Sequence, residues 1–247
     1  MGQTTQGHFR TRLKAFFNWA TRLELIDRNP SLGLEPVTPN SKQTVPLSPK
    51  QFEELLAACD AYDANESRKI GKELRALFLV MRWSGLRIGD ALMLHRFALS
   101  GNRLTITTQK TGTPLVAVLP DCAVEALSSL PSKTGIHADY FFWSHACSPA
   151  TLTSQWNLRI QELNGYLKVR DERGQPMRFH SHMLRDTFAI QLLLVGVPLE
   201  DVSRALTHAS IRVTEKFYAP WIRARREQLE DKLVAAMRKQ GATFAGI

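Results

Sequence analysis

The stretch from Arg178 to Tyr218 gathers cationic and imidazole side chains and ends on a phenol. His182 and Arg185 are three residues apart, which on a helix places both side chains on one face, one turn apart. A guanidinium offers a planar fork of donors, and an imidazole can donate or accept a proton. This pair of groups therefore suits a phosphate, and the phenol is a candidate nucleophile.

Each of these pieces has an ordinary explanation when it is taken alone. A lone His-x-x-Arg pair is usually a solvated helix face, and a lone tyrosine after an amphipathic helix is usually a packing residue. The interpretation changes because two further cationic groups, Arg87 and Lys110, precede the stretch, and His208 lies within it. The order and the conjunction of the groups carry the prediction.

These groups lie in short motifs that together resemble the signature of the tyrosine recombinases, the phage-integrase family. The motifs are Ser84-Gly-Leu-Arg87-Ile-Gly-Asp90, Gln109-Lys110-Thr-Gly, His182-Met-Leu-Arg185, Leu206-Thr-His208 and finally Tyr218. The resemblance extends from about Leu47 to Tyr218, which is most of the chain. One departure is Thr207, where the family usually has glycine, and we expect threonine to make the same turn.

The resemblance implies that the chain cleaves and rejoins DNA by transesterification. The Tyr218 hydroxyl would attack a phosphodiester and form a 3′-phosphotyrosyl link, leaving a free 5′-hydroxyl. Arg87 and Arg185 would clamp the non-bridging oxygens, since the developing phosphorane carries extra negative charge. His208 would donate one more hydrogen bond to it.

The remaining two groups would move protons. A phenol with a pKa of about 10 is a poor nucleophile at neutral pH, so it needs a base, and His182 is the residue we assign to that role. Lys110 would protonate the departing 5′-oxygen, because cationic surroundings can lower the pKa of an amine. A lysine at the tip of a hairpin is ordinarily a solvent-exposed residue, and it is the resemblance that assigns it to the site.

No cofactor or metal is expected for this reaction, because the phosphotyrosine stores the energy of the broken bond. The sequence contains no P-loop, no dinucleotide-binding glycine motif and no carboxylate cluster suited to magnesium. A nuclease or polymerase of the two-metal kind needs such acidic ligands.

The composition is consistent with a DNA partner. The 247 residues carry a formal net charge of +9, with a sequence pI near 9.7. A basic surface attracts polyanions, double-stranded DNA among them, although a basic protein without a nucleic-acid partner would have the same charge. Cys59, Cys122 and Cys147 show no metal-ligand or disulfide spacing, which indicates reduced thiols and a cytoplasmic protein. No signal peptide or membrane-spanning run is expected.

The first residues predict a fragment of a helical domain. Residues 8–26 are amphipathic, with Phe9, Leu13 and Phe16 among the apolar positions, and Asn29-Pro30 should end the helix. In the family a helical core-binding domain lies before the catalytic domain, so residues 1–29 resemble its last helix, and the proline-rich residues 30–48 resemble a linker. Either the chain is a truncated piece or the natural protein is short.

The catalytic domain is expected at residues 49–220, mainly α with a small antiparallel β-sheet (α+β), which is the tyrosine-recombinase catalytic fold. Ser48, Pro49 and Gln51 predict a capped helix start, and Asp121 predicts an N-cap. Asp90 could brace an arginine or cap backbone donors. Helices are expected near 49–61, 69–83, 88–94, 121–130, 149–167, 182–195, 198–206 and 210–218, with a β-hairpin at 103–119.

Residues 221–247 are expected to form a last amphipathic helix and tail, with Leu229, Leu233, Val234 and Met237 on its apolar face. In the family such a helix docks on a neighbouring protomer, which favours a homotetramer on DNA. Packing on its own domain is the alternative.

Two other functions stay open. A type IB topoisomerase-like enzyme shares the covalent chemistry, and a non-catalytic DNA-binding module shares the fold. The complete set of six residues argues against the module, because a decayed site usually loses members. The target DNA and a phage, plasmid or mobile-element role cannot be read from the residues.

Overall fold

The computed structural model describes residues 2–37, 45–67, 69–110, 112–133, 135, 138–143, 147–170 and 174–239. The chain divides between residues 43 and 44 into two compact units. Residues 38–44 of the predicted linker lie outside the described part.

The first unit is one helix, α1 (Gln3–Arg22), with a short segment folded against it. The Asn29 amide donates to Asn18 Oδ1 at 2.6 Å, and Arg10 Nε donates to the Leu34 carbonyl at 3.0 Å. Part of the predicted linker therefore forms turns against α1. The helix begins and ends earlier than residues 8–26, and Phe16 on its apolar face is 56% exposed.

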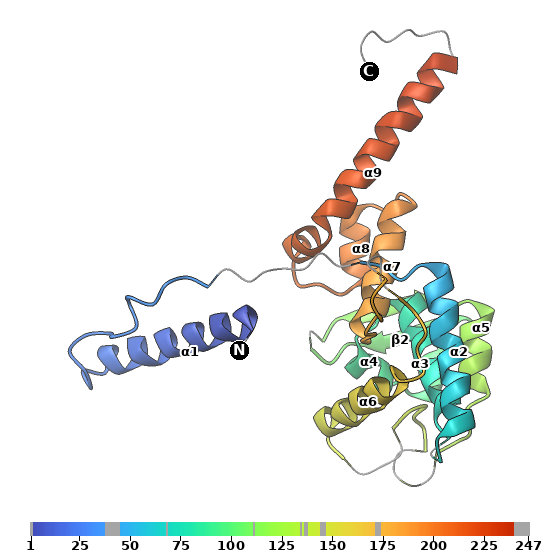
Figure 1. Ribbon diagram of the computed structural model, residues 1–247, viewed down its shortest axis with the longest axis horizontal. Helices are drawn as coiled ribbons and strands as arrows, with labels where there is room; N and C mark the ends of the chain where they lie inside the picture. The colour runs from blue at the N-terminus through green and yellow to red at the C-terminus, as the bar shows by residue number, and fades with distance from the viewer. Residues whose placement is uncertain are drawn as a thin grey trace. The chain divides into compact units, whose positions relative to one another are not determined.

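The second unit is mainly helical with one small sheet, as predicted (Figure 1). Its helices are α2 (Pro49–Asn65), α3 (Gly71–Ser84), α4 (Ile88–Leu92), α5 (Asp121–Ser128), α6 (Pro149–Leu163), α7 (His182–Leu194), α8 (Leu199–Ala205) and α9 (Ile211–Lys239). The central helix is α3, which packs against α2, α5 and α7 and is buried on most sides.

Two helix starts were predicted from local signals, and one of the two predictions is confirmed. The Ser48 hydroxyl accepts from the Gln51 N–H while the Gln51 side chain accepts from the Ser48 N–H, so the predicted capping box at α2 is confirmed. The predicted N-cap at Asp121 is wrong, because Asp121 is the first residue of α5 and its carboxylate accepts from Asn102 Nδ2 at 2.7 Å instead. That bond joins the residue that precedes the hairpin to α5.

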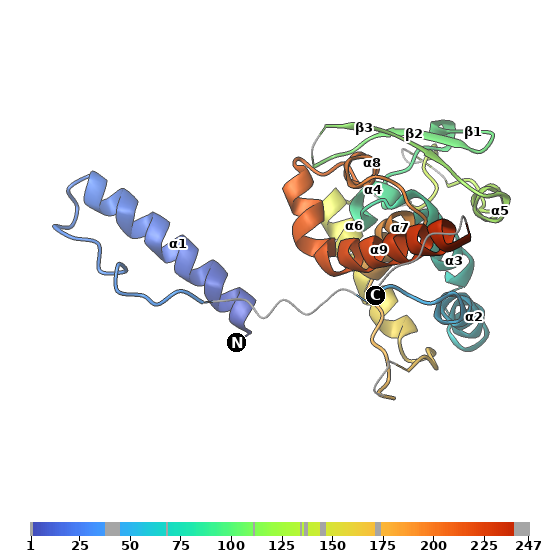
Figure 2. The ribbon, with the colours of Figure 1, turned by 90° about the horizontal axis from the view of Figure 1, so that it is seen from above.

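The sheet has the order β1-β2-β3 and is antiparallel throughout. Strands β2 (Arg103–Thr107) and β3 (Pro114–Val118) form the predicted hairpin, with Thr105 opposite Val116. Strand β1 (Leu99–Ser100) was not predicted, because two residues are too short to show alternation. Figure 2 shows the three strands side by side along one edge of the second unit.

A smaller apolar cluster joins α7, α8 and α9, and Tyr218 belongs to it. The prediction of a separate helix after Pro220 is wrong, because α9 continues through this residue to Lys239. Proline removes one backbone donor from a helix but keeps a helical φ, and packing of α9 on α7 and α8 holds the chain on both sides of it. Beyond these contacts α9 extends away from α7 and α8 (Figure 1), and Leu233 is 48% exposed.

Within the described ranges, no helix is both long enough and apolar enough to cross a membrane.

Candidate active site

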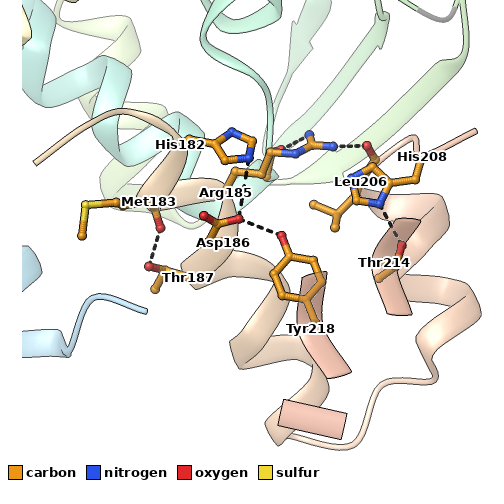
Figure 3. Close-up of polar contacts among 10 residues, drawn as sticks. His182, Met183, Arg185, Asp186, Thr187, Leu206, His208, Thr214 and Tyr218 are labelled. Carbon is orange, nitrogen blue, oxygen red and sulfur yellow. Dashed lines mark hydrogen bonds and ion pairs between the residues drawn. The ribbon is translucent and has the colours of Figure 1, made fainter. Parts of the chain in front are cut away.

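Arg185 lies at the centre of the candidate site, on the first turn of α7 and only 2% exposed. Its guanidinium donates to the Gly85 carbonyl at 2.5 Å and to the Leu206 carbonyl (Figure 3). These carbonyls belong to the segments that carry Arg87 and His208. The buried arginine therefore holds together three stretches of chain that are far apart in the sequence.

Gly85 makes this approach possible. It ends α3 with a φ of +67°, a conformation that favours glycine. A Cβ at this position would lie 2.4 Å from the ring of Phe188, so any side chain would push α3 and α7 apart. Gly85 therefore ends α3 and also lets α7 pack closely enough for Arg185 to reach its partners.

Arg87 follows at once, as the residue before the first turn of α4, where it is half-buried. Its Nη1 donates to the Thr207 hydroxyl at 3.3 Å. Thr207 has a φ of +50°, so threonine does make the turn at which the family usually has glycine. This left-handed conformation is uncommon for a β-branched residue. The hydroxyl contact links the turn to Arg87.

The two guanidinium groups lie close enough to affect each other. The pKa of Arg185 is lowered to about 10, first by burial and then by the positive charge of Arg87. Tyr218, Asp90 and Asp186 oppose the shift. Two guanidinium groups held close together are typical of an anion-binding site, and their planar forks of donors suit phosphate oxygens.

His208 borders the same positive region. Burial, followed by Arg185, Arg87 and His182, lowers the pKa of His208 to about 4, so the imidazole is neutral at pH 7. Its Nδ1 lies 2.8 Å from the hydroxyl of Thr214, a fully buried residue. If the hydroxyl donates to Nδ1, Nε2 carries the ring proton and can donate it to an anion.

His182 begins α7 and its side chain is 62% exposed. Nε2 lies 3.7 Å from Asp186 Oδ1, one turn further along the helix. The pKa of His182 is lowered, first by desolvation and then by Arg185, His180 and Arg87, while Asp186 opposes the shift.

Tyr218 lies on α9 and is 2% exposed. Its hydroxyl donates to Asp186 Oδ1 at 2.8 Å (Figure 3). Burial raises the pKa of Tyr218, the Asp186 carboxylate raises it further, and only Arg185 opposes. The phenol is thus held neutral, with its single proton directed at a carboxylate.

Lys110 is the one predicted residue that the structure does not bring to the others. It is exposed at the tip of the hairpin between β2 and β3, and within the described part of the chain no polar contact links it to the other five. The base of the tip is fixed, because the Gln109 N–H donates to Asp90 Oδ1 at 2.9 Å. Of the two roles considered for Asp90, capping a backbone donor is the one observed.

Asp186 is the main member of the site that was not predicted from the sequence. A signal was present, since Asp186 follows Arg185 directly and lies four residues after His182, which places it on the face of His182. Thr214 was also missed, because a threonine within an amphipathic helix is not distinctive. Among the residues described, no group of three or more His, Cys, Asp or Glu side chains could hold a metal ion.

Comparisons with known proteins agree with the fold. The sequence profile of the phage integrase family matches residues 46–221. The tyrosine recombinase XerC of Rhodospirillum centenum is 26% identical over 223 residues, which cover 87% of this chain and 62% of that protein. A XerC-like recombinase of Caldanaerobacter subterraneus is 25% identical over 242 residues, covering 83% and 59%. The chain thus spans about three fifths of the length of these relatives.

Two solved structures share the fold at low sequence identity. The XerH site-specific recombinase, bound to a palindromic difH substrate in a post-cleavage complex, aligns with a TM-score of 0.65 at 19% identity, covering 94% of this chain and 67% of that one. The Tn1549 transposon integrase, bound to transposon right end DNA, aligns with a TM-score of 0.66 at 18% identity, covering 93% and 80%.

Proposed function

Because the chain belongs to the phage integrase family, we propose that it is a site-specific DNA recombinase that works through a covalent link to Tyr218. One observation supports this most strongly: Arg87 and Arg185 lie close enough to His208 to lower its pKa, and the Tyr218 hydroxyl donates to Asp186, the residue after Arg185 on α7. A phosphate in this region would have donors on several sides and a nucleophile beside it.

The two arginines act as the clamp on the scissile phosphate. Arg185 uses two of its five N–H donors on the carbonyls of Gly85 and Leu206, which fix the plane of its guanidinium and leave others for phosphate oxygens. Arg87 is anchored by one contact to Thr207. His208, neutral and braced by Thr214, adds a hydrogen bond from Nε2. Donors that are already ordered stabilise the charge of the transition state without reorganisation.

Lys110 is the proposed acid for the leaving 5′-oxygen. It lies on an exposed hairpin tip, so bound DNA can contact it directly. We infer that the tip moves toward the phosphate when DNA binds, while the bond between Gln109 and Asp90 holds its base. The amine would then donate its proton as the P–O bond to the 5′-oxygen breaks.

The proposed partner is double-stranded DNA. The net charge of +9 and the positive site support it, and two proteins with this fold, XerH and the Tn1549 integrase, are bound to DNA in the structures compared. Binding should weaken steeply with salt, because phosphate contacts release counterions. A DNA substrate implies the cytoplasm and the nucleoid as the place of action.

Oligomerisation through α9 forms part of the proposal. Leu229, Leu233 and Met237 recur at a spacing of four on α9 and are about half exposed. A neighbouring protomer could cover this stripe in a tetramer on DNA. We also keep the assignment of α1 to a helical core-binding domain, whose exposed apolar side chains would pack on further helices.

A covalent-capture assay tests the function. A pool of random-sequence duplexes, nicked so that the cleaved end diffuses away, is incubated with the protein and run on denaturing gels. The wild type should form a protein–DNA adduct that survives EDTA, and Tyr218→Phe should bind the same DNA without an adduct. An adduct with Tyr218→Phe would refute the nucleophile. Relaxation of supercoils without exchange between two sites would favour the topoisomerase-like alternative.

A further inference from the structure

We propose that Asp186 is the catalytic base for Tyr218, and that His182 acts on this carboxylate rather than on the phenol. The inference rests on the proposed function and revises one role within it. It assigns a task to a buried carboxylate that the motifs do not include.

The hydrogen-bond geometry is the first argument. A phenol has one proton, and the Tyr218 hydroxyl donates it to Asp186 Oδ1 at 2.8 Å. His182 Nε2 lies 3.7 Å from the same oxygen. The shared Oδ1 therefore lies between the imidazole and the nucleophile (Figure 3). A proton that leaves the phenol along its existing hydrogen bond arrives on Asp186.

Burial is the second argument. Asp186 is 7% exposed and Tyr218 is 2% exposed, so bulk water has little access to the hydroxyl. The proton must then pass to a protein group that already touches Oη. Asp186 is that group, because its Oδ1 already accepts the hydrogen bond from Oη.

The step balances as a concerted displacement. A free carboxylate has a pKa about six units below that of a free phenol, so it cannot hold the proton before attack begins. As the Oη–P bond forms, the oxygen loses basicity and the Oη–H bond breaks toward Asp186 Oδ1. The P–O bond to the 5′-oxygen breaks in the same displacement, and that oxygen takes a proton from Lys110. In the reverse step, protonated Asp186 returns its proton to Tyr218.

His182 then has a positioning role. Its imidazole lies beside the carboxylate and can orient Oδ1, or take up the proton after attack. Other ionisable groups also face this pair and would shape a pH profile; they are Arg87, Asp90, His180, Arg185 and His208. The distinguishing experiment must therefore compare variants and not rely on the wild-type profile alone.

Single-turnover adduct formation on nicked DNA separates the roles. Asp186→Asn keeps the size of the side chain and an oxygen that can accept from Tyr218, but it removes the base. We expect it to slow adduct formation by about 10²–10⁴-fold. Asp201→Asn, an exposed carboxylate on α8 that pairs with Arg204, is the matched control and should keep the wild-type rate.

A substrate with sulfur in place of the 5′-bridging oxygen separates the base from the acid, because a thiolate leaves without protonation. Lys110→Ala should recover on this substrate, whereas Asp186→Asn should stay slow. His182→Gln should lose less than Asp186→Asn on both substrates. If Asp186→Asn folds poorly, the rate of His182→Gln still tests which side chain is the base.

The outcomes distinguish the two proposals. If the wild type forms no adduct on any DNA, the proposed function fails and the base role with it. If the wild type is active and Asp186→Asn is equally fast or faster, Asp186 only holds the resting tyrosine and the base role is overturned. A His182→Gln variant that is slowed by about 10²–10⁴-fold would return the base role to His182.

Discussion

Replacing Tyr218 by phenylalanine tests the contact on which the resting site depends, without any DNA. The substitution removes only the hydroxyl, and the apolar ring keeps its place among α7, α8 and α9. What is lost is one hydrogen bond between a buried phenol and the Asp186 carboxylate. The change in the free energy of unfolding therefore reports that bond.

The expected loss is about 1.5–3 kcal/mol, the range for a hydrogen bond to a charged group. The lower half of that range is favoured, since His182 remains near the carboxylate. For a unit of this size each kcal/mol shifts Tm by about 2–4 °C, so Tyr218→Phe should melt roughly 3–9 °C below the wild type. Tyr166→Phe is the control, because its hydroxyl bonds to Glu66 at 2.6 Å in a half-buried place where water can substitute. It should lose clearly less stability than Tyr218→Phe.

Thermal and urea unfolding of Tyr218→Phe, of Asp186→Asn and of the double variant complete a double-mutant cycle. On the Asp186→Asn background, Tyr218→Phe should cost clearly less than on the wild type, because the charged acceptor is already gone. A Tyr218→Phe protein that melts at or above the wild-type temperature would refute the buried contact, and with it the geometry behind the base role of Asp186.

Three further predictions concern the clamp, the turn and pH. Arg185→Lys should slow cleavage of nicked DNA about 10²–10³-fold, since an ammonium cannot make the fork; a near-normal rate would remove it from the clamp. Gly85→Ala should destabilise by about 2–5 kcal/mol in urea unfolding, from a left-handed backbone and a clash with Phe188, whereas Gly101→Ala, with the same sign of φ but open space, should lose only about 1–2. His208 has a folded pKa of about 4 against 6.5 when unfolded. The unfolded chain binds this proton first, so stability is lost as pH falls from 6.5 toward 4; Tm should drop less for His208→Gln between pH 7 and pH 5, and an equal drop would count against the shift.

Much of the arrangement could be predicted from the sequence, because it depends on local signals. The capping box at Ser48, the glycine at residue 85 and the alternation of β2 and β3 each act over a few residues. The order of the motifs also indicated which side chains should lie together in one site. Five of the six predicted residues do lie together, because each either shifts the pKa of another member or has its own pKa shifted by one.

The parts that were missed depend on tertiary contacts. The partner of Tyr218 is 32 positions away on another helix, and nothing local marks the Asp186 carboxylate as its acceptor. The predicted break at Pro220 followed a correct local preference that packing on α7 and α8 overrides. Similarly, Asp121 bonds to Asn102, the residue that precedes the hairpin, rather than capping its own helix.

Local signals could not predict the placement of Lys110, because the proposed mechanism brings it near a phosphate only when DNA is bound. In the described structure it is exposed, while Asp90 holds only the base of its hairpin tip. The proposed role of Lys110 therefore applies to the complex with DNA.

Identification of the residue that carries DNA after capture tests the central claim most directly. Adduct trapped on nicked duplexes is digested with protease and nuclease, and the modified peptide is sequenced by mass spectrometry. The account predicts a nucleotide joined through its 3′-phosphate to Tyr218. Attachment to another residue, a 5′-phosphate link, or cleaved DNA with no protein attached would contradict it.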